Sequence, residues 1–283
     1  MSNIKIFSDS TCDLSPEDIK QMDIGIVPLS IVFNNDVYKE GIDINTKQLF
    51  KMVKAQKVLP KTSAPSPAEF VEHFKPFVDE GKTIIYISLS SKVSSTYNNA
   101  CTAAEMLGND KVKVIDSLDF CCTLGGLVKY CYNFCQSDMA VDDIVNEITK
   151  IKDNYKLFFT VEALDYLHMG GRCSATQLIF GNTLNIKPII LMSKDGMDVW
   201  RKTLGKKKAI NLMIEEAARD KDKIRYNEIH IGCSVGNEGE LNWLKKQLIK
   251  ETGITKYHEY EIGCVISSHC GEGTVGLGYF LEE

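Results

Sequence analysis

Short apolar runs alternate with helix-like segments through the first half of this sequence, and this order limits the possible folds more than any other feature. Runs at 4–8, 83–88 and 112–115 are each followed by a segment with helical signals. Because parallel strands must be joined by crossovers, usually helices, the alternation predicts an α/β domain built on a parallel sheet. After Gly170-Gly171 the pattern changes to two helices among strands, which are expected at 186–192, 198–203, 228–233 and 258–267.

This change of pattern predicts two domains. We expect an N-terminal parallel α/β domain over 1–164, completed by 272–283, and a smaller C-terminal α/β domain over 165–271 with a mostly antiparallel sheet. The 283 residues agree with this division, at roughly 150 residues per domain. The N-terminus lacks the apolar core of a signal peptide, and no window approaches the ~20 apolar residues of a spanning helix. A cytoplasmic protein is therefore expected.

Local signals place several helices. Ser66-Pro67-Ala68-Glu69 matches a capping box with proline in the first turn, which predicts a helix over 67–79. The polar segment 57–66 before it is expected to be a loop, and further helices are expected at about 123–136 and 140–154.

Charge and cysteine content exclude several classes of function. With 33 Lys and Arg against 38 Asp and Glu, the net charge of −5 gives no general attraction for nucleic acid, so any basic site must be local. The ten cysteines show no C-x-x-C spacing. We therefore expect free thiols, and neither a metal site nor a cofactor.

The nucleotide and hydrolase motifs are incomplete. Gly271-Glu-Gly-Thr-Val-Gly276 fits G-x-G-x-x-G, but the seven residues after it leave no room for a βαβ unit, so a tight turn beside a ligand is the better interpretation. There is no P-loop and no G-x-S-x-G elbow. The serines at 90, 91, 94 and 95, together with His269, leave an acyl hydrolase open.

Two hydroxyl clusters and one histidine indicate an anion site. Thr62-Ser63 and Ser94-Ser95-Thr96 each precede an expected helix, where they can cap it and also bind an anion. His269 follows an expected apolar strand and precedes a glycine-rich turn, where its ring can project into a cavity. A carboxylate or phosphate suits this combination.

Six motifs together resemble the DegV family of bacterial fatty-acid-binding proteins, some of which are the FakB binding subunits of fatty acid kinase. The motifs span the chain in the order Asp9-Ser-Thr-Cys-Asp-Leu14, Thr62-Ser-Ala-Pro-Ser-Pro67, Ser90-Ser-Lys-Val-Ser-Ser-Thr-Tyr97, Gly170-Gly-Arg172, Lys187-Pro188 and His269-Cys-Gly-Glu-Gly273. The resemblance implies a fatty acid bound between two α/β domains, with its carboxyl group held by Thr62, Ser94 and His269. Ser63, Ser95 and Gly271 belong to the same motifs and are expected at the ligand.

The resemblance also implies a partner, a fatty acid kinase that phosphorylates the bound acid. Arg201, within a stretch from Lys194 to Arg225 that carries ten basic and six acidic residues, is the candidate for contact with phosphate or the kinase, and Arg172 is a second. We expect a binding subunit without catalysis of its own, making at most transient contact with membranes. A hydrolase, a phosphotransferase and a lipid carrier without a kinase remain the alternatives.

Four residues depart from the family pattern. Ser95 replaces a glycine, Val93 a leucine, and Cys264 and Glu272 replace prolines. Glu272 places an extra carboxylate close to the expected anion site, which leaves the affinity and the shape of the pocket open.

Overall fold

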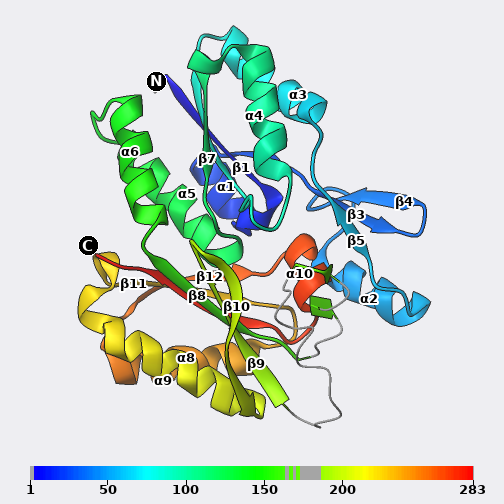
Figure 1. The fold of residues 1–283 in the computed structure, drawn as a ribbon, viewed down its shortest axis with the longest axis vertical. Helices are drawn as coiled ribbons and strands as arrows, with labels where there is room; N and C mark the ends of the chain where they lie inside the picture. Colours follow the sequence, from blue (N-terminus) through cyan, green and yellow to red (C-terminus); the bar gives the residue numbers. More distant parts are fainter. Residues whose placement is uncertain (1–2, 163–165, 168–169, 173–185, 283) are drawn as a thin grey trace.

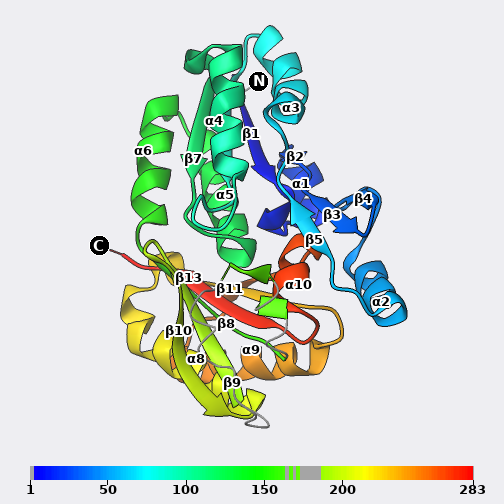
Figure 2. The ribbon, with the colours of Figure 1, turned by 45° about the vertical axis from the view of Figure 1, so that its right-hand side comes forward.

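A computed structural model describes residues 3–162, 166–167, 170–172 and 186–282 of the chain, and its strands form three sheets (Figures 1 and 2). The first sheet is parallel throughout, in the order β2-β1-β6-β7. Its strands are β1 (Ile4–Asp9), β2 (Gly25–Val27), β6 (Thr83–Ser88) and β7 (Val112–Asp116). The predicted parallel sheet of an α/β fold is confirmed.

The second sheet has six strands in the order β10-β9-β8-β13-β11-β12, and all neighbours are antiparallel except β11 and β12. Its strands are β8 (Tyr155–Thr160), β9 (Ile186–Ser193), β10 (Gly196–Leu204), β11 (Glu228–Cys233), β12 (Lys256–Glu261) and β13 (Val275–Phe280). The expected mostly antiparallel sheet is confirmed.

Helices and sheets alternate in layers (Figure 1). The helices α3 and α4 pack on one face of the parallel sheet, α5 lies between the two large sheets, and α8 and α9 cover the far face of the six-stranded sheet. The helices are α1 (Pro16–Gln21), α2 (Thr46–Gln56), α3 (Pro67–Asp79), α4 (Thr96–Leu107), α5 (Cys121–Cys135), α6 (Val141–Lys152), α8 (Lys206–Asp220), α9 (Glu238–Thr252) and α10 (Cys264–Cys270).

Two glycines let the central helix α5 lie close to its neighbours on both sides. A Cβ at Gly125 would lie 2.5 Å from the carbonyl oxygen of Cys12, in the turn that follows β1, and one at Gly126 would lie 2.4 Å from the ring of His230 on β11. One buried apolar cluster therefore continues from Ile85 of the parallel sheet to Phe159 of the six-stranded sheet.

A small third sheet with α2 forms an arm, residues 30–63, that extends to one side of the molecule in both views (Figures 1 and 2). Its strands are β3 (Ser30–Phe33), β4 (Asp36–Lys39) and β5 (Lys61–Ser63), in the order β4-β3-β5. The prediction of a loop over 57–66 is wrong at 61–63, because β5 gains its hydrogen bonds from β3, a partner distant in sequence.

The capping box at Ser66 is confirmed. Its hydroxyl accepts the Glu69 N–H, and the Glu69 carboxylate accepts the Ser66 N–H at 2.7 Å. The predicted strand over 258–267 is confirmed at 258–261 and wrong beyond, because β12 ends at Glu261 and α10 begins at Cys264.

Sheet membership also differs from the predicted domain limits. β13 lies between β8 and β11, so residues 272–283 do not complete the N-terminal sheet, and β8 of the expected first domain belongs to the second sheet. The junction at 163–165 and Cys173 lie outside the described residues. The nine described cysteines are free thiols, and none of the described helices could cross a membrane.

Candidate functional site

Three polar side chains from distant parts of the sequence line one cavity of about 290 Å³. Thr62 comes from β5, Ser94 from the segment before α4, and His269 from the last turn of α10. Ser63 and Ser95 also line this cavity. The structure thus brings together five of the six residues predicted to bind the ligand.

His269 is held as a neutral ring. Its Nε2 lies 2.9 Å from Thr62 Oγ1, while its buried Nδ1 has no hydrogen-bond partner among the described residues and packs against Gly170. Burial, together with the nearby Arg172, lowers the pKa of His269 to about 4. Near pH 7 the imidazole can therefore donate one hydrogen bond without carrying a charge.

Ser94 is oriented by the start of α4. Its Oγ lies 2.8 Å from Thr96 Oγ1 and accepts the Thr96 N–H at 3.3 Å. Ser95 occupies the N-cap position but provides no capping hydrogen bond, with φ −79°, a value that does not require the family's glycine. Because the Ser95 side chain leaves the first turn of this twelve-residue helix open, the positive end of the helix favours an anion beside Ser94.

The rest of the cavity wall is mainly apolar. The sequence did not predict that these residues line the cavity, because an apolar side chain carries no sign of whether it faces a cavity or the core. They are Leu29, Ala64, Leu89, Val93, Phe120, Leu167, Met197, Val265, Ile266 and Cys270. Hydroxyl and imidazole groups beside such a wall suit a ligand with one anionic end and an apolar body.

Arg172 provides the permanent charge among the described lining residues. Its Nη1 donates to the Gly170 carbonyl at 2.7 Å and its Nε to the Val93 carbonyl at 3.4 Å. The side chain is exposed, so part of its hydrogen-bonding capacity remains available for an anion at the mouth of the cavity.

The remaining predicted residues lie outside this lining. Gly271 has φ +82°, where a Cβ would meet the Tyr166 ring, so it serves the turn after α10. Arg201 stacks on Trp200 at 4.6 Å on β10. Glu272 forms an ion pair with Lys54 at 2.8 Å, so its negative charge is neutralised locally.

The arrangement differs from that of a Ser-His-Asp hydrolase. Within the part of the chain that the structure describes, His269 Nε2 meets a threonine, its Nδ1 meets no carboxylate, and Ser94 bonds to Thr96. Among the described residues, no group of three or more His, Cys, Asp or Glu side chains could hold a metal ion.

A larger cavity of about 760 Å³ suits an anionic ligand less well. It is lined by Asp13, Glu17, Glu40, Glu259 and Glu261, and its described lining includes no Lys, Arg or His. Burial raises the pKa of Asp13 and of Glu40, which shows that this environment already disfavours negative charge. A carboxylate ligand is therefore expected in the smaller cavity.

Comparisons with known proteins give one consistent result. The model of the DegV family, described as "Uncharacterised protein, DegV family", matches residues 3–282. A DegV domain-containing protein of Clostridium acetobutylicum is 36% identical over 284 residues, a match that covers 100% of both chains.

Two of the similar solved structures are examples whose descriptions name a fatty acid. A stearic acid-binding protein from Eubacterium ventriosum is 26% identical, with a TM-score of 0.87 and 98% of each chain covered. The fatty acid kinase B3 protein of Streptococcus pneumoniae, loaded with linoleic acid, is 22% identical, with a TM-score of 0.85 and 99% of each chain covered. The second likeness shows a shared fold.

Proposed function

Since the chain belongs to the DegV family, we propose that it binds a long-chain fatty acid in the 290 Å³ cavity and presents the carboxyl group to a fatty acid kinase. The observation that carries the first part is the convergence of Thr62, Ser94 and His269 at a cavity whose other walls are mainly apolar. The fatty acid ligands of the two structural relatives support the same part.

The hydrogen bonds of the site suit a carboxylate. In this proposal the neutral His269 donates from Nε2 to Thr62 Oγ1, which leaves the Thr62 hydroxyl proton for the ligand. Ser94 donates a second hydroxyl proton, and the start of α4 contributes its positive end. These donors offset the hydration that a buried carboxylate loses.

Burial of the acyl chain supplies most of the binding free energy. A chain of sixteen to eighteen carbons releases roughly 12 kcal/mol on full burial, at ~0.8 kcal/mol per CH₂. At ~25 Å³ per carbon, the ratio at which a ~150 Å³ cavity holds benzene, 290 Å³ accommodates about twelve carbons. A longer chain must therefore displace wall side chains, and the flexible Met197 is suited to this.

Extraction of the purified protein followed by lipid mass spectrometry tests the binding. We expect fatty acid near one equivalent, and weaker retention after Thr62→Ala, Ser94→Ala or His269→Ala, at about 1–3 kcal/mol for each lost donor. Thr102→Ala, Ser137→Ala and His73→Ala are the matched controls outside the cavity and should retain the ligand.

Wild-type protein that is empty and binds no fatty acid in solution would contradict the proposal. Turnover of an acyl ester that Ser94→Ala abolishes while binding survives would indicate the hydrolase instead. Affinities measured for fatty acids of ten to eighteen carbons give the chain length beyond which an added CH₂ no longer increases the binding free energy.

The second part of the proposal concerns transfer to a kinase. The exposed Arg201 and Arg172 are the candidates for contact with the phosphoryl group or the partner, because a guanidinium matches phosphate oxygens. With a fatty acid kinase domain and ATP, Arg201→Ala should keep its fatty acid and fail to support acyl-phosphate formation. Equal transfer by Arg201→Ala and wild type would remove Arg201 from the mechanism, and no transfer by wild type would favour a plain carrier.

A further inference from the structure

The arm, residues 30–63, has a charge opposite in sign to that of the whole chain. Its six lysines and three acidic residues give +3, in a chain of −5. Lys39 pairs with Glu69, and Lys54 pairs with Glu272. The other four lysines are exposed and form no ion pair with a described residue; they are Lys47, Lys51, Lys57 and Lys61.

Helix α2 concentrates part of this charge on one side. Lys47, Lys51 and Lys54 follow the spacing i, i+4, i+7 and share a face, while Leu49 and Phe50 are buried on another side. Like charges at this spacing repel and weaken an isolated helix. A negatively charged surface against this face would relieve the repulsion.

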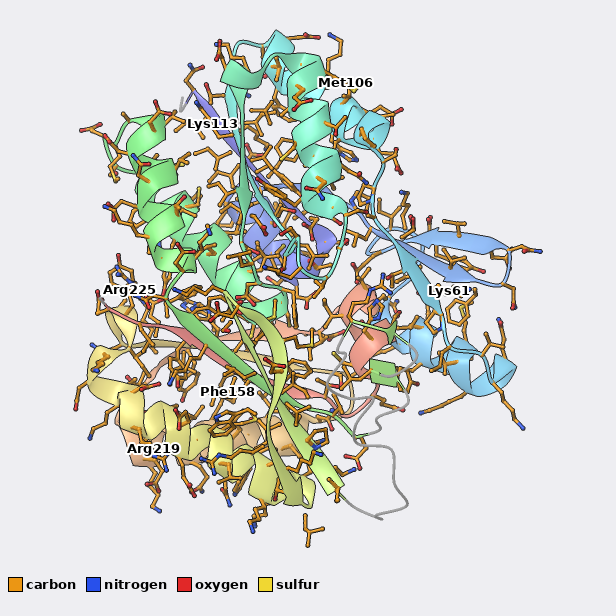
Figure 3. The ribbon with its side chains drawn as sticks, viewed as in Figure 1. Lys61, Met106, Lys113, Phe158, Arg219 and Arg225 are labelled. Carbon is orange, nitrogen blue, oxygen red and sulfur yellow. The ribbon has the colours of Figure 1, made fainter. Side chains whose placement is uncertain are left out.

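The arm also exposes apolar side chains. Seven large apolar side chains are exposed among the described residues. Three of them belong to the arm: Val37 at 61%, Ile42 at 72% and Val58 at 39%. Val37 and Lys61 flank Val32 on one face of the small sheet, so apolar and basic groups lie side by side there. Figure 3 shows Lys61 on the arm.

The arm is joined to the fatty-acid cavity. Strand β5 places Lys61 next to Thr62, which contacts His269, and the Lys54–Glu272 ion pair ties α2 to the turn that follows α10. The arm projects from the layered body in both views (Figures 1 and 2), so it can meet a flat surface.

We propose that the arm binds the surface of an anionic lipid membrane. Unpaired lysines supply attraction to acidic headgroups, and the exposed Val37, Ile42 and Val58 can enter the interface. Nucleic acid fits less well, because the arm has no arginine and its aromatic residues Phe33, Tyr38 and Phe50 are not exposed for stacking.

Flotation of ligand-stripped protein with vesicles tests this surface. Wild-type protein should float with vesicles of phosphatidylcholine plus phosphatidylglycerol and much less with phosphatidylcholine alone, and high salt should release most but not all of it. The triple variant Lys47→Glu, Lys51→Glu and Lys57→Glu should lose binding, at about fivefold in affinity for each lysine charge removed. Val37→Ser with Ile42→Ser should weaken the binding that remains at high salt.

The matched control reverses three exposed lysines elsewhere, in the variant Lys208→Glu, Lys221→Glu and Lys246→Glu, and should still float. Equal loss in this control, or full binding by the arm variants, would overturn the proposal. Circular dichroism checks that each variant is folded. Bound fatty acid is measured separately, on the protein before stripping. A protein that is empty as purified and binds no added fatty acid, but still floats, would contradict the proposed function and leave the membrane surface standing.

Discussion

At the scale of single residues, the position of His269 depends on a glycine that does not line the cavity. A Cβ at Gly170 would lie 2.5 Å from His269 Nδ1, closer than the two atoms can approach. The imidazole is thus confined between Thr62 on one side and a bare backbone on the other.

Gly170→Ala is therefore expected to push the ring away from Thr62. Retention of fatty acid should weaken by about 1–3 kcal/mol, the range for a lost hydrogen bond in a buried site, as measured by ligand titration. Gly239→Ala is the control, because a Cβ there meets no atom within 4 Å. Unchanged retention in Gly170→Ala would show that the ring position does not matter.

Asp119 is a second residue whose environment makes a measurable prediction. It precedes Phe120, which lines the cavity, and its Oδ2 is buried without a hydrogen-bond partner among the described residues. Burial raises the pKa of Asp119 to about 8. The folded state therefore holds a proton that the unfolded state releases above about pH 4.

The sign follows from this difference in bound protons. The contribution of protonated Asp119 to the free energy of unfolding is fully present below about pH 4. It is lost as the pH rises toward 8, by at most about 1.4 kcal/mol per pH unit. Asp119→Asn cannot titrate and can still accept the Phe120 N–H, so its stability relative to wild type should rise between pH 4 and 8 in urea unfolding. A constant difference across this range would mean that Asp119 is ionised in the folded protein.

At the scale of elements, the short helix α10 connects two carboxylates to the ligand site. Asp13 Oδ1 accepts the Gly263 N–H at 3.1 Å and Glu40 Oε1 accepts the Val265 N–H at 2.8 Å, while His269 lies in the last turn. The first backbone donors of α10 thus find acceptors on distant parts of the chain.

Removal of one acceptor should loosen the whole helix. Glu40→Ala leaves the Val265 N–H unpaired, so we expect a loss of about 1–3 kcal/mol in the free energy of unfolding and weaker fatty acid retention. Urea unfolding and ligand titration measure the two effects. Glu259→Ala, an exposed residue of the same acidic cavity, should change both little, and equal effects of the two variants would exclude the role of Glu40 in α10.

At the scale of the whole molecule, the cavity draws its walls from several layers. Thr62 comes from the arm, Phe120 from the junction of the parallel sheet with α5, and Met197 from the six-stranded sheet. The hydrophobic cluster that contains Phe120 also spans both large sheets, as the position of α5 in Figure 1 suggests. A ligand bound in this cavity would therefore stabilise contacts between layers.

Delipidation should lower the thermal stability of the entire protein. Restoring fatty acid at a hundred times Kd should add about 2.7 kcal/mol, seen as a higher Tm in calorimetry. An alcohol of equal chain length, which lacks the carboxylate, should restore less. Equal restoration by acid and alcohol would show that the polar end contributes no stability.

The sequence by itself determined the local elements and the residue types of the site. The helix over 67–79 follows from the Ser66 and Glu69 capping box, and the parallel sheet follows from alternating strands and helices, because both signals act over a few residues. The resemblance to a family placed Thr62, Ser94 and His269 in one site before any distance was known, and the structure brings them together at one cavity.

Tertiary structure alone decided the features that depend on distant partners. Residues 264–270 form a helix whose first N–H groups are accepted by Asp13 and Glu40. Residues 61–63 form a strand because β3 lies beside them. Strand β13 joins the second sheet because β8 and β11 flank it. The sequence likewise did not indicate that apolar residues such as Phe120 and Val265 line the cavity. Local propensity favours a conformation only weakly, whereas a hydrogen bond or apolar contact from a distant segment can reverse the preference, and nothing near the residue in sequence records it.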